Sequence, residues 1–381
     1  MSFRTSLCAI ALALALTPAA AESRSFDTQK VKLRADIVTR GLEHPWGLAF
    51  LPGGDALVTE RPGRIRILTK TGLSAPVKGV PKVAVGGEGG LLDIAIARDF
   101  ERSGTIFFSY AKPARRGTGI AVARARLNRE GASPRLEDVK VIFEVAPKSK
   151  TKWHFGSRIV VNDDGTLFIT TGDLSQEMRA QDMHDAAGAV VRIKPDGSIP
   201  ADNPSPDGKK MAPEIWSKGH RNIQGAVIDP VMGGLVTVEH GAKGGDEVNH
   251  PEAGKNYGWP IISYGTNYDG TKIGIGTAAP GYEQPLYYWD PSIAPSGLVS
   301  YQGNMFPEWK GDLLVGALSF QLVSRLHRDA KGKILDEERM LEGEFGRIRD
   351  VIEAPDGAVW LLTDEDDGAV VRLSRGDKKS E

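Results

Sequence analysis

The sequence is poor in three features, and each absence excludes a class of function. It has one cysteine, Cys8, which lies near the start, so the rest of the chain can form no disulfide and perform no thiol chemistry. Its formal net charge is −1, which gives no reason to expect nucleic acid or an acidic membrane surface as a partner. Beyond residue 21 no apolar run approaches the ~20 residues that a membrane-spanning helix needs.

The first 21 residues, MSFRTSLCAIALALALTPAAA, have the layout of a secretory signal peptide. A basic residue, Arg4, precedes an apolar stretch at residues 7–16, and small residues follow at 19–21. The apolar stretch is too short to cross a bilayer, so we expect cleavage after Ala21; a buried N-terminal helix is the alternative. We therefore expect a periplasmic or secreted protein in which residues 22–381 form one domain.

The rest of the chain is rich in turn-forming residues. The sequence has 45 Gly and 23 Pro, with 40% apolar and 25% charged residues, a balance that favours many short strands. Two apolar segments joined by a turn of Gly, Pro, Asn or Asp recur along the chain, which is typical of β-hairpins. The copies are residues 47–60, 91–110, 158–173, 225–241, 298–318 and 350–365. Six copies at spacings of roughly 45 to 75 residues predict an all-β, six-bladed β-propeller, with a large β-sandwich as the alternative.

Polar side chains precede the first strand in four of these copies. In a propeller the loops at one face converge on the central channel, so we expect these side chains to ring its mouth. They are Glu88, His154, Arg221, Asn222, Arg347 and Arg349.

The arginines of this ring indicate an anionic ligand with several carboxylates or phosphates, because guanidinium groups bind such groups bidentately. His154 is the natural general base, because histidine is the side chain that changes charge nearest neutral pH. Taken singly, His154 could instead be a packed or capping residue, and Arg347 and Arg349 could form a solvated strand face.

Residues 239–260, EHGAKGGDEVNHPEAGKNYGWP, form a glycine-rich stretch with several acids and an aromatic end. Glycines at this density permit turns that point carbonyl oxygens inward. Together with the carboxylates of Asp246 and Glu247, such carbonyls are the hard oxygen ligands that calcium takes. A plain acidic surface loop is the alternative, and the stretch does not match the EF-hand pattern.

Several motifs in this chain match one family in composition and order. They are WHFGSR, GHRNIQG, EHG followed by GGDEVN, NYGWP, SYGTNYDG, YYWDPSIAPSG and FGRIRDV. In this combination, residues 37–373 resemble the soluble aldose sugar dehydrogenases that depend on pyrroloquinoline quinone (PQQ), within the glucose/sorbosone dehydrogenase family. Members of that family are six-bladed propellers, which implies an active site at one end of the central channel.

The resemblance implies calcium-assisted oxidation of the anomeric hydroxyl of an aldose to a lactone, with hydride passing to PQQ and electrons to an external acceptor. It implies that His154 is the catalytic base and that Arg221, with Asn222, stabilises charge at the quinone end of PQQ. Further positions that match cofactor-contacting residues are Glu88, His240, Asp246, Tyr268, Ser319, Arg347 and Arg349. Positions that match calcium ligands are Glu247 with the Tyr257 carbonyl, and the Gly241 and Ala242 carbonyls at a second ion.

Three positions depart from the family pattern. Glu88 stands where the family commonly has Gln, and Ser319 stands where a lysine usually helps to neutralise PQQ. Ala242 replaces a common proline, with little consequence if only its carbonyl is used. The first two changes shift the local charge by about two units against an anionic cofactor, so we expect weaker PQQ retention than is typical.

Two other classes of function fit the same pattern. One is a calcium-dependent, lactonase-like propeller hydrolase, which would act without a redox dye. The other is a non-catalytic propeller that binds glycans or proteins. On the dehydrogenase interpretation, we expect an aldose substrate, an external electron acceptor and a monomer or homodimer.

Overall fold

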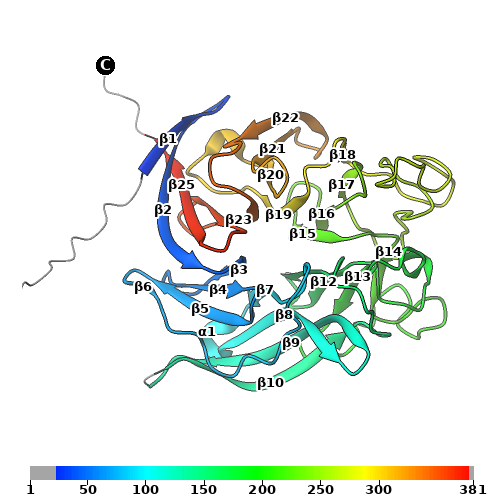
Figure 1. The fold of residues 1–381 in the computed structure, drawn as a ribbon, viewed down its shortest axis with the longest axis horizontal. Helices are drawn as coiled ribbons and strands as arrows, with labels where there is room; N and C mark the ends of the chain where they lie inside the picture. The colour runs from blue at the N-terminus through cyan, green and yellow to red at the C-terminus, as the bar shows by residue number, and fades with distance from the viewer. Residues whose placement is uncertain (1–22, 132, 377–381) are drawn as a thin grey trace, which may run out of the picture.

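The computed structural model describes residues 23–131 and 133–376, and the predicted signal peptide lies outside them. Within this part of the chain, strands β1 to β25 form six antiparallel sheets arranged as a ring around a central channel (Figure 1). The first strands of neighbouring sheets contact one another around the ring. The prediction of an all-β, six-bladed β-propeller is confirmed.

The first three blades follow one another along the chain, and each is a four-stranded sheet. Blade one contains β3 (Pro45–Phe50), β4 (Ala56–Glu60), β5 (Arg64–Thr69) and β6 (Gly72–Leu73). Blade two contains β7 (Leu91–Ile96), β8 (Thr105–Ala114), β9 (Gly117–Asn128) and β10 (Arg135–Glu144). Blade three contains β11 (Gly156–Val161), β12 (Leu167–Thr171), β13 (Ala189–Ile193) and β14 (Ile215–Lys218).

The last three blades complete the ring. Blade four contains β15 (Ile223–Ile228), β16 (Leu235–Glu239), β17 (Asp246–Asn249) and β18 (Tyr287–Trp289). Blade five contains β19 (Pro295–Ser300), β20 (Leu313–Ala317), β21 (Val323–Arg328) and β22 (Ile334–Met340). Blade six contains β23 (Ile348–Glu353), β24 (Val359–Thr363), β25 (Gly368–Arg375), β2 (Lys32–Leu42) and β1 (Ser23–Asp27).

Each repeated sequence unit corresponds to the first two strands of a blade. In blade three the Asn162 amide donates to the Thr166 carbonyl at 2.8 Å, and the Gly165 amide donates to the Asn162 carbonyl at 2.9 Å. Gly165 has a φ of +81°, a conformation that glycine adopts without the steric cost of a side chain. The Asp-Gly turn thus reverses the chain between two apolar strands.

The sixth blade joins the two ends of the chain. Strand β2, near the N-terminus, pairs with β25, near the C-terminus, with Leu33 opposite Arg375 and Leu42 opposite Gly368. Pairing across the ends closes the ring with backbone hydrogen bonds, a feature that the repeat pattern did not reveal.

The interior separates an apolar core between blades from a polar channel. Large side chains such as Phe107, Phe108 and Trp309 are fully buried between sheets. Along the channel, below its mouth, Arg158 lies 3.1 Å from Asp93 and 3.1 Å from Asp350. This buried ion cluster joins the first strands of blades two, three and six.

Helices are few among residues 23–131 and 133–376. They are α1 (Phe100–Ser103) and the 3₁₀ helices η1 (Glu177–Gln181) and η2 (Pro307–Trp309). None of these described helices has the length and apolar character needed to cross a membrane.

Candidate active site

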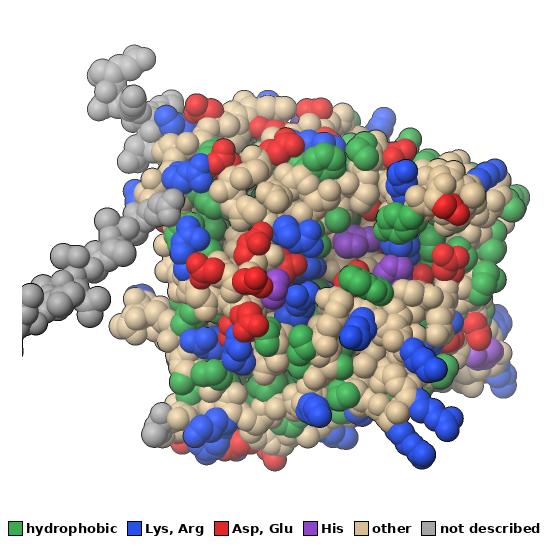
Figure 2. All heavy atoms as spheres, in the orientation of Figure 1, with side chains coloured by type: hydrophobic (Ala, Val, Ile, Leu, Met, Phe, Trp, Pro, Cys, Tyr) green, Lys and Arg blue, Asp and Glu red, His purple; other side chains and the backbone are tan. Residues whose placement is uncertain are grey.

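Three loops that precede first strands meet at one end of the channel. The Glu88 carboxylate, ahead of β7, accepts a hydrogen bond from the His154 backbone amide at 2.8 Å. The same oxygen accepts one from Asn222 Nδ2, ahead of β15, at 3.2 Å. Three of the ring residues expected from the sequence therefore lie together, and histidines and charged side chains gather at the centre of this face (Figure 2).

His154 is held by a buried carboxylate. Its Nδ1 lies 2.7 Å from Asp173 Oδ1, and Asp173, which follows β12, is fully buried. An ionised carboxylate only accepts hydrogen bonds, so the His154 proton sits on Nδ1 and Nε2 of the neutral ring carries a free lone pair. The arrangement can accept a proton at Nε2 and stabilise the resulting imidazolium.

Asp173 is fixed in turn by two further donors. Its Oδ1 accepts from the Ser175 amide at 2.7 Å, and its Oδ2 accepts from Trp259 Nε1 at 2.8 Å. Sequence reasoning missed Asp173 and Trp259 as site residues. Asp173 could have been found, because it is the acid that ends the third hairpin copy. Trp259 comes from a loop 86 residues further along the chain, and no feature of the repeat points to it.

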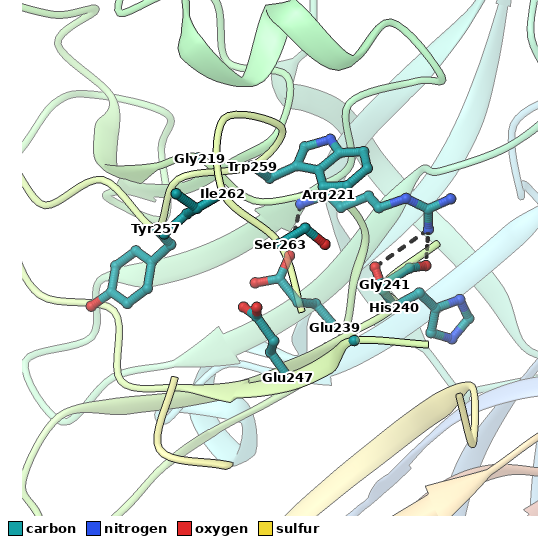
Figure 3. Close-up of a pocket in the computed structure, with 11 residues that line it drawn as sticks. Gly219, Arg221, Glu239, His240, Gly241, Glu247, Tyr257, Trp259, Ile262 and Ser263 are labelled. Carbon is teal, nitrogen blue, oxygen red and sulfur yellow. Dashed lines mark hydrogen bonds between the residues drawn. The ribbon is translucent and has the colours of Figure 1, made fainter. Parts of the chain in front are cut away.

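Arg221 and His240 lie on the glycine-rich side of the mouth. One Arg221 guanidinium nitrogen donates to the His240 carbonyl at 3.3 Å and to the Gly241 carbonyl (Figure 3). The guanidinium lies 5.2 Å from the centre of the Trp259 ring, a cation–π distance. Its Nε is buried and finds no hydrogen-bond partner in the described part of the chain.

His240 is neutral in this site. Burial, followed by the charges of Arg221 and Arg349, lowers the pKa of His240 to about 3. Its Nε2 lies 2.9 Å from the Pro295 carbonyl, which can only accept, so Nε2 carries the proton. His240 therefore offers an unprotonated Nδ1 and no positive charge.

Arg347 lies just ahead of β23 and Arg349 lies within it, and the two arginines differ in their surroundings. Arg349 is buried, with its guanidinium 2.6 Å from Asp364 Oδ2 and 3.1 Å from Gln224 Oε1, and its Nε has no partner among the described residues. The Arg347 side chain is 44% exposed and donates to the Leu318 carbonyl at 3.3 Å, which places it beside Ser319. Arg347 is therefore the more available of the two for an anion.

A second histidine–carboxylate pair, which sequence reasoning also missed, lies at the channel mouth. His44 Nδ1 is 2.8 Å from Asp364 Oδ1, and His44 immediately precedes β3. Although burial opposes ionisation, Arg349 holds the pKa of Asp364 well below its usual range. Asp364 is thus a fixed negative charge that orients both Arg349 and His44.

A small cavity lies beside the mouth, between two acidic side chains. Glu239 and Glu247 line it together with Tyr257, and the volume open to the centre of a water-sized sphere is about 20 Å³ (Figure 3). Burial, followed by the charge of Glu239, raises the pKa of Glu247 to about 8. Asn249 donates to both carboxylates, at 2.9 and 3.0 Å, while its own Oδ1 has no partner among residues 23–131 and 133–376.

These features fit a small hard cation. The cavity is large enough for one water or ion. The two carboxylates that line the cavity are ligands of the type that calcium uses. No group of three or more His, Cys, Asp or Glu side chains with metal-binding geometry occurs in the described residues, so any ion here would also need carbonyl ligands.

The remaining predicted residues have other surroundings. Asp246 is fully buried and braces the loop, accepting from the Gly241 amide at 2.8 Å and from Ser292 Oγ at 2.7 Å. The Gly241 carbonyl accepts from Arg221, and Ala242 is buried. Tyr268 is 74% exposed, and no hydrogen bond in the described structure ties its side chain to the ring.

The chain is similar to known proteins over most of its length. The sequence profile described as Glucose / Sorbosone dehydrogenase matches residues 42–372. Aldose sugar dehydrogenase YliI of Escherichia coli K12 is 40% identical over 349 residues, covering 90% of this chain and 93% of that protein. Quinoprotein glucose dehydrogenase B of Acinetobacter calcoaceticus is 27% identical over 443 residues, covering 93% and 91%.

Solved structures agree with the sequence relatives. The soluble aldose sugar dehydrogenase from Escherichia coli, in its apo form, has a TM-score of 0.86 and 40% identity, covering 90% of this chain and 100% of that chain. The PQQ-bound form of the aldose sugar dehydrogenase from Streptomyces coelicolor has a TM-score of 0.73 and 27% identity, covering 94% and 99%.

Proposed function

This chain belongs to the glucose/sorbosone dehydrogenase family, and on that premise we propose that it oxidises the anomeric hydroxyl of aldoses to lactones with PQQ as cofactor. The observation that carries the proposal is the His154–Asp173 pair, 2.7 Å apart, at a channel mouth that also holds Arg221 and Arg347. A proton acceptor beside an arginine cluster is the arrangement that oxidation of an alcohol next to an anionic cofactor requires.

The residues present fit PQQ, a tricarboxylate quinone. Arg221 and Arg349 each have a buried Nε without a partner in the described chain, and Arg347 presents a partly exposed guanidinium. We assign Arg347 and Arg349 to the carboxylates, and Arg221 with Asn222 to the quinone end. When bound, PQQ supplies the two-electron acceptor for the reaction.

His154 performs the proton chemistry in this scheme. Its Nε2 takes the proton of the anomeric hydroxyl, since Nδ1–H is committed to Asp173. The buried carboxylate stabilises the imidazolium by a charge-assisted hydrogen bond without itself becoming protonated. Arg221, held by its bonds to the His240 and Gly241 carbonyls, stabilises negative charge that develops across the site.

Calcium belongs to the proposal as a structural and polarising ion. Glu247 and the Tyr257 carbonyl would hold one ion in the cavity, and Glu239 faces the same space. The Gly241 and Ala242 carbonyls would hold a second ion nearer the mouth. A cation there favours negative charge at the reacting centre.

Two side chains oppose cofactor binding. Glu88 adds a carboxylate to the ring, although one of its oxygens already accepts two hydrogen bonds from His154 and Asn222. Ser319 supplies no charge where it adjoins Arg347. We therefore propose that PQQ binds more weakly here than in relatives with Gln and Lys at these positions. We also propose export, an external electron acceptor, and a monomer or homodimer.

The test uses purified protein with added PQQ and calcium, an aldose and a neutral redox dye. Dye reduction that needs both additions and is lost in His154→Ala supports the proposal. His327→Ala is the matched control, because His327 lies on blade five in β21, with Asp312 as its partner at 3.0 Å. Absence of PQQ binding, or lactone hydrolysis without any dye, would contradict the proposal and favour the hydrolase.

A further inference from the structure

A group of basic side chains lies beside the active-site mouth. Residues 112–118 and 144–153 contain six Lys or Arg and one acid, whereas the whole chain has a net charge of −1. We call the six the basic rim: Lys112, Arg115, Arg116, Lys148, Lys150 and Lys152. Figure 2 shows Lys and Arg side chains at the lower right of the face that carries the mouth, over the β8–β9 hairpin.

Backbone contacts hold the two segments of the rim together. The Thr118 amide donates to the Ser149 carbonyl at 2.7 Å, and the Ser149 amide returns a hydrogen bond at 2.8 Å. Gly117, with a φ of +109°, allows this approach, because a Cβ there would lie 2.2 Å from the Ser149 carbonyl oxygen. The β8–β9 hairpin is therefore fixed against the loop that leads to His154.

The rim continues to the edge of the active site. Lys152 precedes His154 by two residues, and its carbonyl accepts the Glu88 amide at 2.8 Å. Between them Trp153 is 54% exposed. This surface therefore combines an exposed aromatic side chain, next to the reacting centre, with cations on one side of it. Such a combination is typical of a small polar protein interface that has one apolar contact.

Most of the rim's positive charge is not neutralised by the protein. Glu144 is 2.5 Å from Lys112 and 3.6 Å from Lys148, and it is shared between them. Arg115, Arg116, Lys150 and Lys152 are exposed and have no salt bridge to an acidic side chain of the described residues. Such a surface attracts negatively charged partners from solution.

The proposed reaction requires a partner of this kind. Each aldose loses two electrons and two protons when its anomeric C–H and O–H bonds break and a carbonyl forms. Two oxidised copies of a one-electron carrier would take the two electrons, and the protons would go to water. We propose that the basic rim docks an acidic one-electron carrier protein next to the mouth, an inference that rests on the proposed function.

Charge reversal at the hairpin tip tests the docking surface. The variant is Arg115→Glu with Arg116→Glu, and the control is Lys331→Glu with Lys333→Glu, on the exposed turn between β21 and β22 in blade five. The probes are an acidic and a basic haem protein of similar reduction potential. Their binding is measured by calorimetry without PQQ, and their reduction is measured with PQQ and aldose.

We expect the rim variant to bind the acidic haem protein at least about tenfold more weakly at low salt, with a difference that shrinks as salt screens the charges. The rim variant should also reduce the acidic haem protein more slowly. The control variant should bind and reduce this haem protein as the wild type does, and the rim variant should reduce a neutral dye at the wild-type rate. Equal binding by variant and wild type, preference for the basic probe, or an effect confined to a small anionic mediator would overturn the docking inference. If the wild type with PQQ and aldose does not reduce the neutral dye, the proposed function is refuted, and the electron-carrier role with it.

Discussion

Replacing Asp173 by asparagine isolates the orienting role of this carboxylate, because it changes charge and one acceptor atom with little change of shape. Asp173 accepts from His154 and Ser175 at one oxygen and from Trp259 at the other. An asparagine amide has one accepting oxygen and one donating nitrogen, so the variant must turn its NH₂ group towards either Trp259 or His154.

Either orientation impairs proton transfer. With NH₂ towards His154, the ring must accept at Nδ1 and carry its proton on Nε2, the atom that has to receive the substrate proton. With NH₂ towards Trp259, the amide N–H and the indole N–H are two donors that face each other, so the asparagine and Trp259 move apart. A hydrogen bond to a charged group contributes ~1.5–3 kcal/mol. If that energy is lost only in the transition state, kcat falls by about 10- to 150-fold.

The assay is steady-state dye reduction at saturating PQQ and calcium, with the PQQ dissociation constant measured separately by fluorescence titration. Trp259→Phe supplies the control, because it removes the competing donor and lets the amide oxygen of Asp173→Asn face His154. We expect the double variant to lose less activity than the two single variants predict together. An unchanged kcat in Asp173→Asn, or additive losses in the double variant, would refute the reasoning.

Three further changes test the charges around the site. Ser319→Lys should tighten PQQ binding about tenfold by adding a cation beside Arg347, as measured by titration, and an unchanged dissociation constant would count against this placement. Glu88→Gln should also tighten PQQ binding while keeping an acceptor for the His154 amide, so weaker binding would show that the carboxylate is needed. Calcium removal should make the stability of the fold depend on pH through Glu247. Because the pKa of Glu247 is raised to about 8, this side chain stays protonated in the folded calcium-free protein at pH values where it is ionised in the unfolded chain. The folded protein therefore binds more protons than the unfolded chain between the ordinary pKa of a glutamate and about pH 8. Its melting temperature should therefore fall as pH rises from about 5 to 8, and this fall should be smaller with calcium or in Glu247→Gln; an equally steep fall in both would contradict the assignment.

The fold was predictable from the sequence because its information is local. In residues 158–173 two apolar strands flank an Asp-Gly turn, and the structure places Gly165 at positive φ where the chain reverses. Six such units specify six blades. The pairing of β2 with β25 was not predictable in the same way, because strands more than 320 residues apart leave no turn signal between them.

The site was predictable where equivalent loops converge and not where distant side chains meet. Glu88, His154 and Asn222 were found because they occupy one position of the repeat, and their hydrogen bonds join them. Trp259 was missed because no periodicity links it to Asp173, although its indole fixes that carboxylate at 2.8 Å. The contacts of Arg347 with the Leu318 carbonyl and of Arg349 with Gln224 likewise come from other blades.

The pairing of β2 with β25 also affects how the molecule can be made. Until the residues of β25 have been synthesised, β2 has no partner on one side, and a strand with open backbone groups can pair with another chain. Contacts between residues so far apart in sequence form slowly, because a long loop must close first. Deleting the last strand should therefore open the ring and favour aggregation, even though every residue of the active site would still be present.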